Sequence, residues 1–434
     1  EGVREMSCHV KGKAWRWGLA AAAGIACLGA PARSLGAETP AFEQVREIRP
    51  AGDDSHLKLT SFCVTPEGKI LAIVSSAGAD GHESPGGLVS GVVSLFQGGG
   101  KPAEPKTEVR VLDAEGKVLE SWPLDFAAHA INVSPRGEIV VGGDGVLARY
   151  DAHGKQLARG EAPHVVANRT NAGALEQQAR DIVESQATSL KEALADFERQ
   201  KAELEAKPQE ELNDEEKEVL ASIDGTIAAY KQAVEHQQTP NDAQVKQQIE
   251  QMVQYLGTQQ KKVNAIAASD TNVYVTCVAT KGYGYDVWRT DLEFGSPEKI
   301  VSGLRGCCGQ MDVQCCDNEL IVAENARHRV VKFGIDGAEH KSWGKRSRDG
   351  EGETFGGCCN PMNTRLVGDK LYVAESDGQI KLFSPEGEFQ AVLGKANVDP
   401  GCKSSIVDAS ADGNRLYYFN VNNSGICVLE RAKQ

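Results

Sequence analysis

The sequence predicts an all-β fold, a six-bladed β-propeller, with an α-helical hairpin or coiled-coil subdomain inserted into it. Three observations lead to this prediction. Apolar runs of strand composition recur along the chain, one cysteine-pair motif is nearly repeated within that pattern, and a central stretch shows helical periodicity. A period of two residues is typical of strands, whereas a period near 3.6 is typical of helices.

Six units of similar composition make up the repeat. Their strands are rich in Val, Ile, Tyr and Phe and are separated by Asp-Gly, Glu-Gly or His-Gly turns, which is a β-hairpin pattern. Recurrence at ~40–50 residues indicates propeller blades rather than a sandwich. The sixth unit lacks a convincing fourth strand, and residues 42–50 could supply it and close the ring. The clearest copies of one strand are EIVVGG (138–143), ELIVAE (319–324), KLYVAE (370–375) and RLYYFN (415–420).

The cysteine-pair motif reads GCCGQMD over 306–312 and GCCNPMN over 357–363, and blade 6 begins with a further Gly-Cys at 401–402. Adjacent residues of a strand point to opposite faces, so one cysteine of each pair should face the channel. Soft sulfur ligands suit copper(I) or zinc, and several thiolates together suit an iron–sulfur centre. The predicted metal ligands at the channel rim are Cys307, Cys308, Met311, Cys358, Cys359, Met362 and Cys402, with His129 of blade 2 as a nitrogen donor.

The same cysteines have two other interpretations. The chain has 12 cysteines, and those outside the predicted leader are even in number, which in an oxidising compartment indicates disulfides. Disulfides between blades would stabilise the ring, and Met311 and Met362 would then fill the core. Alternatively, the thiols are simply buried, as we expect for Cys63, Cys277 and Cys427. The sequence leaves these interpretations open.

Residues 1–37 are predicted to be a secretory signal peptide, and those before Met6 to be upstream read-through. Basic residues precede an apolar stretch over 19–30, which small residues follow. This order is that of a signal peptide, and the apolar stretch is too short to span a bilayer. We therefore expect a periplasmic or extracellular protein without a membrane span. Lipoprotein anchoring at Cys27 is not expected.

Between residues 171 and 262 the composition changes to Ala, Glu, Gln and Lys, with apolar residues at helical spacing. The expected domains are blades 1 and 2 over 38–170, a helical hairpin with a shorter third helix over 171–262, and blades 3 to 6 over 263–434. In a propeller, the connection that carries these helices reaches the same face as the cysteine pairs. A glycine-rich excursion over 76–106 should cover that face as well, and loops above a channel commonly bind ligands.

Several segments carry a family resemblance: LRGCCGQMD, NARHRVVKF, FGGCCNPMN with the AES that follows it, and YGYDVWRTD over 283–291. In these the chain resembles exported bacterial six-bladed propellers of the NHL-repeat type that carry CCxxM motifs. The resemblance spans most of the chain after the signal peptide, including the helical insertion. It implies the propeller architecture and assigns no activity. Pro361 and Asn363 fit the NHL pattern, whereas Gln310 departs from it.

The favoured function is a binding module that holds a protein or small-molecule ligand at the face covered by the helices and the excursion over 76–106. A second hypothesis is a scaffold whose helices dock another protein. The net charge of −14 and the lack of a basic stripe disfavour nucleic acid. The alternative is a propeller hydrolase or lyase with a metal in the channel. Its candidate ligands do not share one register, and no GxSxG or HExxH motif supports it. Those candidates are His129, Asn132, Asp312, Asn363 and Asp408.

Overall fold

The computed structural model describes residues 41–52, 54–76, 106–169, 172–208, 211–237, 242–279, 284–307, 309–399, 401 and 404–432. The predicted signal peptide, nearly all of the glycine-rich excursion, and the two cysteines Cys308 and Cys402 lie outside these residues. So does the Thr239-Pro240 pair that separates two of the predicted helices.

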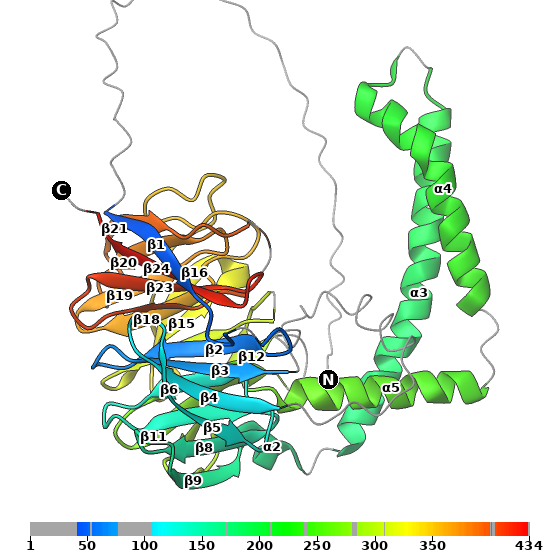
Figure 1. Cartoon of the computed structure of the whole chain (residues 1–434). Helices are drawn as coiled ribbons and strands as arrows, with labels where there is room; N and C mark the ends of the chain where they lie inside the picture. The colour runs from blue at the N-terminus through cyan, green and yellow to red at the C-terminus, as the bar shows by residue number, and fades with distance from the viewer. Residues whose placement is uncertain are drawn as a thin grey trace, which may run out of the picture. The chain divides into compact units, whose positions relative to one another are not determined.

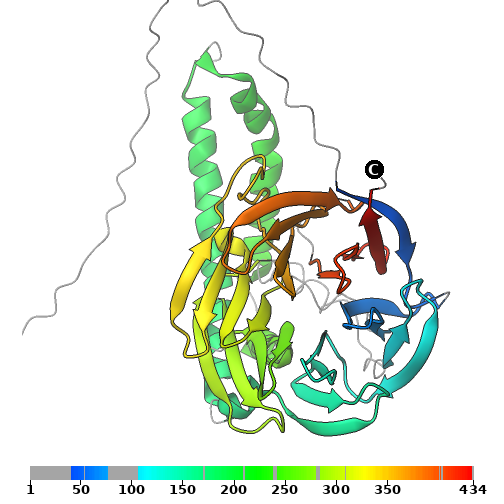
Figure 2. The same cartoon turned by 90° about the vertical axis from the view of Figure 1, so that its left-hand side faces the viewer.

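Six four-stranded antiparallel sheets form a six-bladed β-propeller (Figures 1 and 2). Blade 1 contains β2 (Lys58–Val64), β3 (Ile70–Ser75), β4 (Thr107–Leu112) and β5 (Val118–Leu124). Blade 2 contains β6 (Ala130–Val133), β7 (Ile139–Gly143), β8 (Val146–Tyr150) and β9 (Gln156–Glu161). Blade 3 contains β10 (Ala265–Ala268), β11 (Asn272–Val278), β12 (Tyr285–Asp291) and β13 (Glu298–Leu304).

The remaining blades follow the same order. Blade 4 contains β14 (Asp312–Cys316), β15 (Glu319–Glu324), β16 (Arg329–Gly334) and β17 (Glu339–Trp343). Blade 5 contains β18 (Asn363–Val367), β19 (Lys370–Ala374), β20 (Gln379–Phe383) and β21 (Phe389–Lys395). Blade 6 contains β22 (Val407–Ala409), β23 (Arg415–Asn420), β24 (Gly425–Arg431) and β1 (Phe42–Ile48).

The ring is closed by the first strand of the described chain, as the sequence predicts. Strand β1 pairs antiparallel with β24 and forms the outer edge of blade 6, with Ile48 opposite Ile426. The innermost strands β2, β6, β10, β14, β18 and β22 contact one another in order, and β22 contacts β2. Both ends of the chain therefore contribute to one blade.

Glycines in the turns between the outer strands allow neighbouring blades to approach closely. Gly154 and Gly387 have φ angles of +79° and +84°, which favour glycine. A Cβ atom at Gly154 would lie 2.5 Å from the Trp122 ring, and one at Gly387 would lie 2.4 Å from the Trp343 ring. Each indole belongs to the preceding blade and packs directly on the backbone of the next one.

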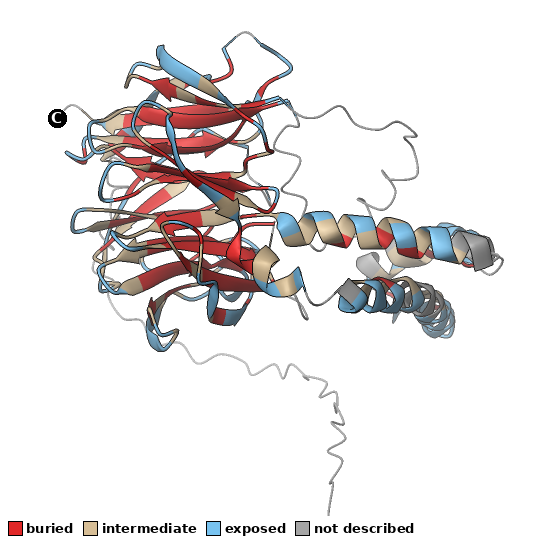
Figure 3. Ribbon diagram, turned by 90° about the horizontal axis from the view of Figure 1, so that it is seen from below, coloured by how far each residue is buried: buried red, intermediate tan, exposed pale blue. Residues whose placement is uncertain are grey.

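Among the described residues between β9 and β10, the chain forms the helices α2 (Pro163–Asn168), α3 (Ala172–Glu205), α4 (Asp214–Gln237) and α5 (Asp242–Lys261). The first part of α3 packs on α5 through an apolar cluster around Ala179 and Ile249. Its last part packs on α4, where the rings of Phe197 and Tyr230 are 5.1 Å apart. Because α3 buries its apolar residues against α4 and α5, much of the outer surface of these helices is exposed (Figure 3).

The end of α5 is attached to blade 2 by a hydrogen bond of 2.7 Å from the Gly145 N–H to the carbonyl of Lys261. None of the helices that the structure describes is both long and apolar enough to span a bilayer. The apolar core lies within and between the blades (Figure 3).

Candidate functional site

The polar side chains of the inner strands join each blade to the next. Every one of the six junctions has a hydrogen bond between a side chain of one blade and the backbone of its neighbour, so these bonds form a continuous ring around the channel. The bonds, in blade order, are Thr60 Oγ1 to Ala128 O (3.3 Å), Asn132 Nδ2 to Ile266 O (2.7 Å), Asn264 Nδ2 to Gly309 O (2.7 Å), Thr364 N to Asp312 Oδ2 (2.8 Å), Val407 N to Asn363 Oδ1 (2.9 Å) and Val64 N to Asp408 Oδ2 (2.7 Å).

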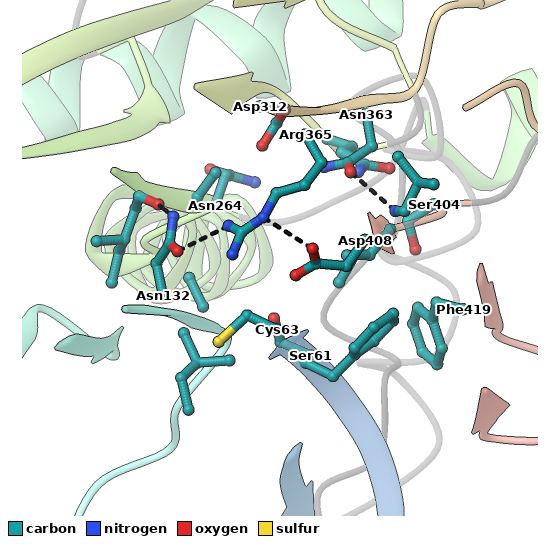
Figure 4. A pocket seen from close by; sticks show the side chains of 18 of the residues that line it. Ser61, Cys63, Asn132, Asn264, Asp312, Asn363, Arg365, Ser404, Asp408 and Phe419 are labelled. Atoms are coloured by element: carbon teal, nitrogen blue, oxygen red, sulfur yellow. Dashed lines mark hydrogen bonds and ion pairs between the residues drawn. The ribbon is translucent and has the colours of Figure 1, made fainter. Parts of the chain in front are cut away.

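The guanidinium of Arg365 crosses the channel from blade 5 (Figure 4). Its Nε donates to Asp408 Oδ1 at 2.9 Å, and its NH1 donates to Asn132 Oδ1 at 2.8 Å. Blades 2 and 5 are opposite each other in a ring of six. A sequence signal for this role exists, because Arg365 is a charged residue within a short inner strand. Its partners could not be predicted, since Asp408 lies in the adjacent blade 6 and Asn132 in the opposite blade 2.

These contacts bear on the channel-metal alternative. Asn132, Asp312, Asn363 and Asp408 all have partners in the ring of hydrogen bonds, and Asp408 also neutralises Arg365. A further cation in the channel would meet the positive charge of Arg365 at close range, in a buried environment where repulsion is strong. These contacts therefore disfavour the hydrolase or lyase alternative.

Asp312 is a channel carboxyl whose pKa is raised by burial. Burial raises its pKa to about 6, although the Thr364 hydroxyl and N–H both donate to its Oδ2 and oppose the shift. Burial also raises the pKa of Asp408, and Arg365 opposes that shift. Asp312 therefore titrates near neutral pH.

A cavity of about 50 Å³ lies at the mouth of the channel and is lined by His129, Asn264, Asp312 and Ser404, among others. At roughly 10–15 Å³ per water it has room for a few water molecules. His129 occupies the position in blade 2 that Met362 occupies in blade 5, since their N–H groups bond to equivalent carbonyls, those of Gly142 and Ala374. The structure thus places His129 across the ring from blade 5, away from the cysteine motifs.

Sulfur atoms from two blades converge at the rim between blades 4 and 5. Cys359 and Met362 form a buried cluster, and the half-buried Cys307 of the blade 4 motif packs against it. The Sγ of the exposed Cys358 lies 3.2 Å from the Sγ of Cys359. We call these four residues, Cys307, Cys358, Cys359 and Met362, the sulfur cluster.

Asn325 connects the two motifs. Its Oδ1 accepts the Cys307 N–H at 2.7 Å, and its Nδ2 donates to the Cys307 carbonyl at 3.1 Å and contacts Met362 Sδ at 3.7 Å. In blade 5 the corresponding asparagine lies in the motif itself: Asn360 Oδ1 accepts the Ser376 N–H at 2.8 Å. Each of the two motif loops is therefore held by one asparagine, which comes from the turn in blade 4 and from the motif itself in blade 5.

His328 is a buried residue in the turn between β15 and β16, near the sulfur cluster. It is only 6% exposed, and its φ of 54° places the turn in the left-handed region. Burial and the charge of Arg346 lower its pKa, and a backbone hydrogen bond with Cys358 opposes the shift. Its Nδ1 is buried without a hydrogen-bond partner among the described residues. A neutral imidazole therefore lies beside the Cys358 backbone.

The other predicted ligands lie elsewhere or outside the described residues. Met311 is fully buried in the core between blades 3 and 4, with Tyr285 and Val313. Cys308 and Cys402 have no described position. Among the residues that the structure does describe, no three His, Cys, Asp or Glu side chains are arranged to hold a metal ion, and no two cysteines form a disulfide. Cys63, Cys277 and Cys427 are buried in the blades, as expected.

A pocket of about 330 Å³, the rim pocket, opens beside the sulfur cluster and is lined by Arg348, Gly357, Cys358, Asn360 and Asp377, among others. One wall is the loop over 344–356, which the fully buried Lys381 holds in place. The Lys381 ammonium donates to the carbonyls of Gly350 (2.6 Å) and Thr354 and pairs with Glu375 Oε1 at 2.6 Å.

The sheets define the class of protein, a six-bladed β-propeller. No protein-family model and no curated protein sequence matches the chain. Among solved structures, similarity is found to the structure of U3-55K (9% identity, 90% of this chain and 100% of that one, TM-score 0.41) and to the WD40 repeats of RRP9 (9%, 91% and 99%, 0.40). A protein of unknown function from Bacteroides caccae is similar at 11% identity, over 78% and 82%, with a TM-score of 0.36.

Proposed function

We propose that this protein is an exported binding propeller of the NHL type that binds a soft metal cation, copper(I), at the sulfur cluster. One observation carries the proposal: sulfur atoms from two separate motifs pack together at one rim, and one of them, Cys358, also lines the rim pocket. If the cluster only filled the apolar core, all of its thiols would be buried, whereas Cys358 is exposed beside a pocket.

The identity of the donors favours copper(I) over the other soft metals. Structural zinc sites use four ligands from Cys, His and carboxylates, and iron–sulfur clusters use several thiolates. The sulfur cluster instead places the thioether of Met362 beside the thiols, and mixed thiolate and thioether donors select copper(I). His328 adds an imidazole next to Cys358. Cys308 and Cys402 remain candidate ligands by their place in the repeat.

Binding can be measured by competition with a chromophoric copper(I) chelator, using reduced protein under anaerobic conditions. We expect one copper(I) per chain. Loss of a residue that only supports a metal ligand typically weakens metal binding ~10–100-fold. Because Cys359 and Met362 are proposed as ligands themselves, Cys359→Ser and Met362→Leu should each weaken copper(I) binding by at least this factor. Cys316→Ser is the matched control, because this half-buried cysteine lies in β14 at the opposite end of the blade. Acidification should release the metal, since the ligating thiols must be deprotonated.

The disulfide interpretation predicts a different result. The purified protein would then contain no metal, would show few reactive thiols after denaturation, and would lose stability of about 2–4 kcal/mol on removal of a cysteine. Equal copper(I) affinity in the wild type, Cys359→Ser and Met362→Leu, with all three folded by circular dichroism, would refute the copper proposal.

A further inference from the structure

Cys358 and Cys359 differ in exposure although they are adjacent. Cys358 is exposed and lines the rim pocket, whereas Cys359 is 1% exposed and packs on Met362. Their sulfur atoms nevertheless lie 3.2 Å apart. This separation is only about 1 Å longer than the ~2.05 Å of an S–S bond.

The contact depends on the loop that carries the pair. Cys315 and Cys316 are also adjacent, but they lie in β14, where they pair with Leu320 and Glu319 of β15. Neighbouring residues of a strand point to opposite faces, so a strand keeps such sulfurs apart. Cys358 and Cys359 precede β18 in a loop that Asn360 holds through bonds to Ser376 N (2.8 Å) and Gly356 O (2.9 Å).

We propose that Cys358 and Cys359 form a reversible dithiol/disulfide couple that exchanges with an organic disulfide in the rim pocket. The Cys358 thiolate attacks one sulfur of that disulfide, whose S–S bond breaks and releases one thiolate. Cys359, after loss of its proton, attacks Cys358 Sγ, breaks the mixed disulfide and releases the second thiolate. The protein gives up two electrons and two protons, and the organic disulfide becomes two thiols.

The geometry assigns a role to each cysteine. Cys358 attacks because it is exposed, and the buried Cys359 resolves the mixed disulfide because it already touches the attacking sulfur. A bridge between adjacent residues is strained, since their Cα atoms are about 3.8 Å apart and disulfides usually join Cα atoms about 4.4–6.8 Å apart. Strained and exposed disulfides are easily reduced, so thiols should reverse the reaction.

The exchange uses two sulfurs of the proposed copper site but rests only on the contact between them. The test therefore uses metal-free, fully reduced protein, and its failure would leave the copper measurement unaffected. The probe is an aryl disulfide that releases one coloured thiolate at each displacement. In the wild type we expect a fast phase with two thiolates per chain, no retained aryl group, and a Cys358–Cys359 bridge on peptide mapping.

The variants separate the two steps. Cys359→Ser should release one thiolate in the fast phase and keep one aryl group on Cys358, whereas Cys358→Ser should lose the fast phase. Cys316→Ser should behave as the wild type. A stable aryl adduct on Cys358 of the wild-type protein would overturn the proposal, and so would a peptide map that pairs Cys359 with Cys307. Both measurements use the wild-type protein, so neither depends on the folding of a variant.

Discussion

Asp312 illustrates, at the scale of single residues, what polar side chains in the channel do. The sequence marked it as a candidate ligand of a metal in the channel, which needs carboxylate, amide or imidazole ligands. The structure shows that its carboxylate accepts two hydrogen bonds from Thr364 of the next blade. Periodicity predicts which face of the sheet a side chain occupies. It does not predict the hydrogen-bond partner, which here comes from the neighbouring blade.

The raised pKa of Asp312 predicts a specific dependence of stability on pH. Its folded pKa of about 6 lies above the usual value of 3.8 for an aspartate, so between these values the folded state binds more protons than the unfolded state. Stability contributed by this group is therefore full below about pH 4 and is lost as the pH rises through 6. The loss amounts to about 3 kcal/mol, at 1.36 kcal/mol per pKa unit.

Asp312→Asn keeps an oxygen acceptor for Thr364 and removes the titration. The difference in unfolding free energy between variant and wild type should shift by about 3 kcal/mol in favour of the variant from pH 4 to pH 7.5. Denaturant titrations at the two pH values measure it. A difference that does not change with pH would show that Asp312 does not titrate in this range.

At the scale of elements, the two motif loops are held by asparagines in complementary places. Blade 4 has Gly309 in its motif and Asn325 in its turn, whereas blade 5 has Asn360 in its motif and Ser376 in its turn.

Asn360→Gly should lower the free energy of unfolding by about 1–3 kcal/mol, because the buried groups that Asn360 bonds lose their partner. Adding Ser376→Asn should restore much of that stability, as it recreates the blade 4 arrangement. Thermal unfolding of the two variants measures this, and a double variant no more stable than Asn360→Gly would contradict it.

The sequence predicted the strands of each blade well but not how the rim loops are fixed. Repeated hairpin patterns, and the fixed spacing of the cysteine motifs, are local signals. Lys381 gave no such signal: it lies in β20, and its role depends on the carbonyls of a loop some 30 residues away and on Glu375. The repeat does show that Glu375 is equivalent to Glu324, but it does not show that Lys381 pairs with Glu375.

At the scale of the whole molecule, Arg365 connects opposite sides of the ring. Removing it alone leaves the buried Asp408 unpaired, so Arg365→Met should destabilise the protein by about 3–5 kcal/mol. Asp408→Asn in the same chain removes that buried charge while still accepting the Val64 N–H. The double variant should therefore be more stable than Arg365→Met alone. Strictly additive losses in a double-mutant cycle would show that the two residues do not interact.

The helices should be dispensable for folding of the propeller. Helix α3 buries its apolar residues on α4 and α5, and each blade packs mainly on its neighbours. Replacing residues 171–259 with a short flexible linker keeps Lys261, whose carbonyl binds Gly145. We expect this shortened chain to unfold cooperatively in denaturant and to give a β-type circular dichroism spectrum from which the helical signal has been lost. A broad, non-cooperative transition would mean that the helices support the ring.

The number of blades and the closing strand could be predicted from the sequence because both rest on local patterns and on a repeat. The sulfur cluster could be predicted only in part. The repeat brought Cys307, Cys359 and Met362 to one rim, but it also suggested Met311, which is buried between blades 3 and 4, and His129, which lies in blade 2. Equivalent positions in a repeat share a depth in the channel, and only the closed ring determines which of them are neighbours.

The most direct test of the copper proposal is X-ray absorption at the copper edge of reduced protein loaded anaerobically with one equivalent of copper(I). The sulfur cluster predicts a first shell dominated by sulfur in the wild type and in Cys316→Ser, and a loss of sulfur neighbours in Cys359→Ser and Met362→Leu. A first shell of nitrogen and oxygen only, or a sulfur shell that is the same in all four proteins, would contradict it.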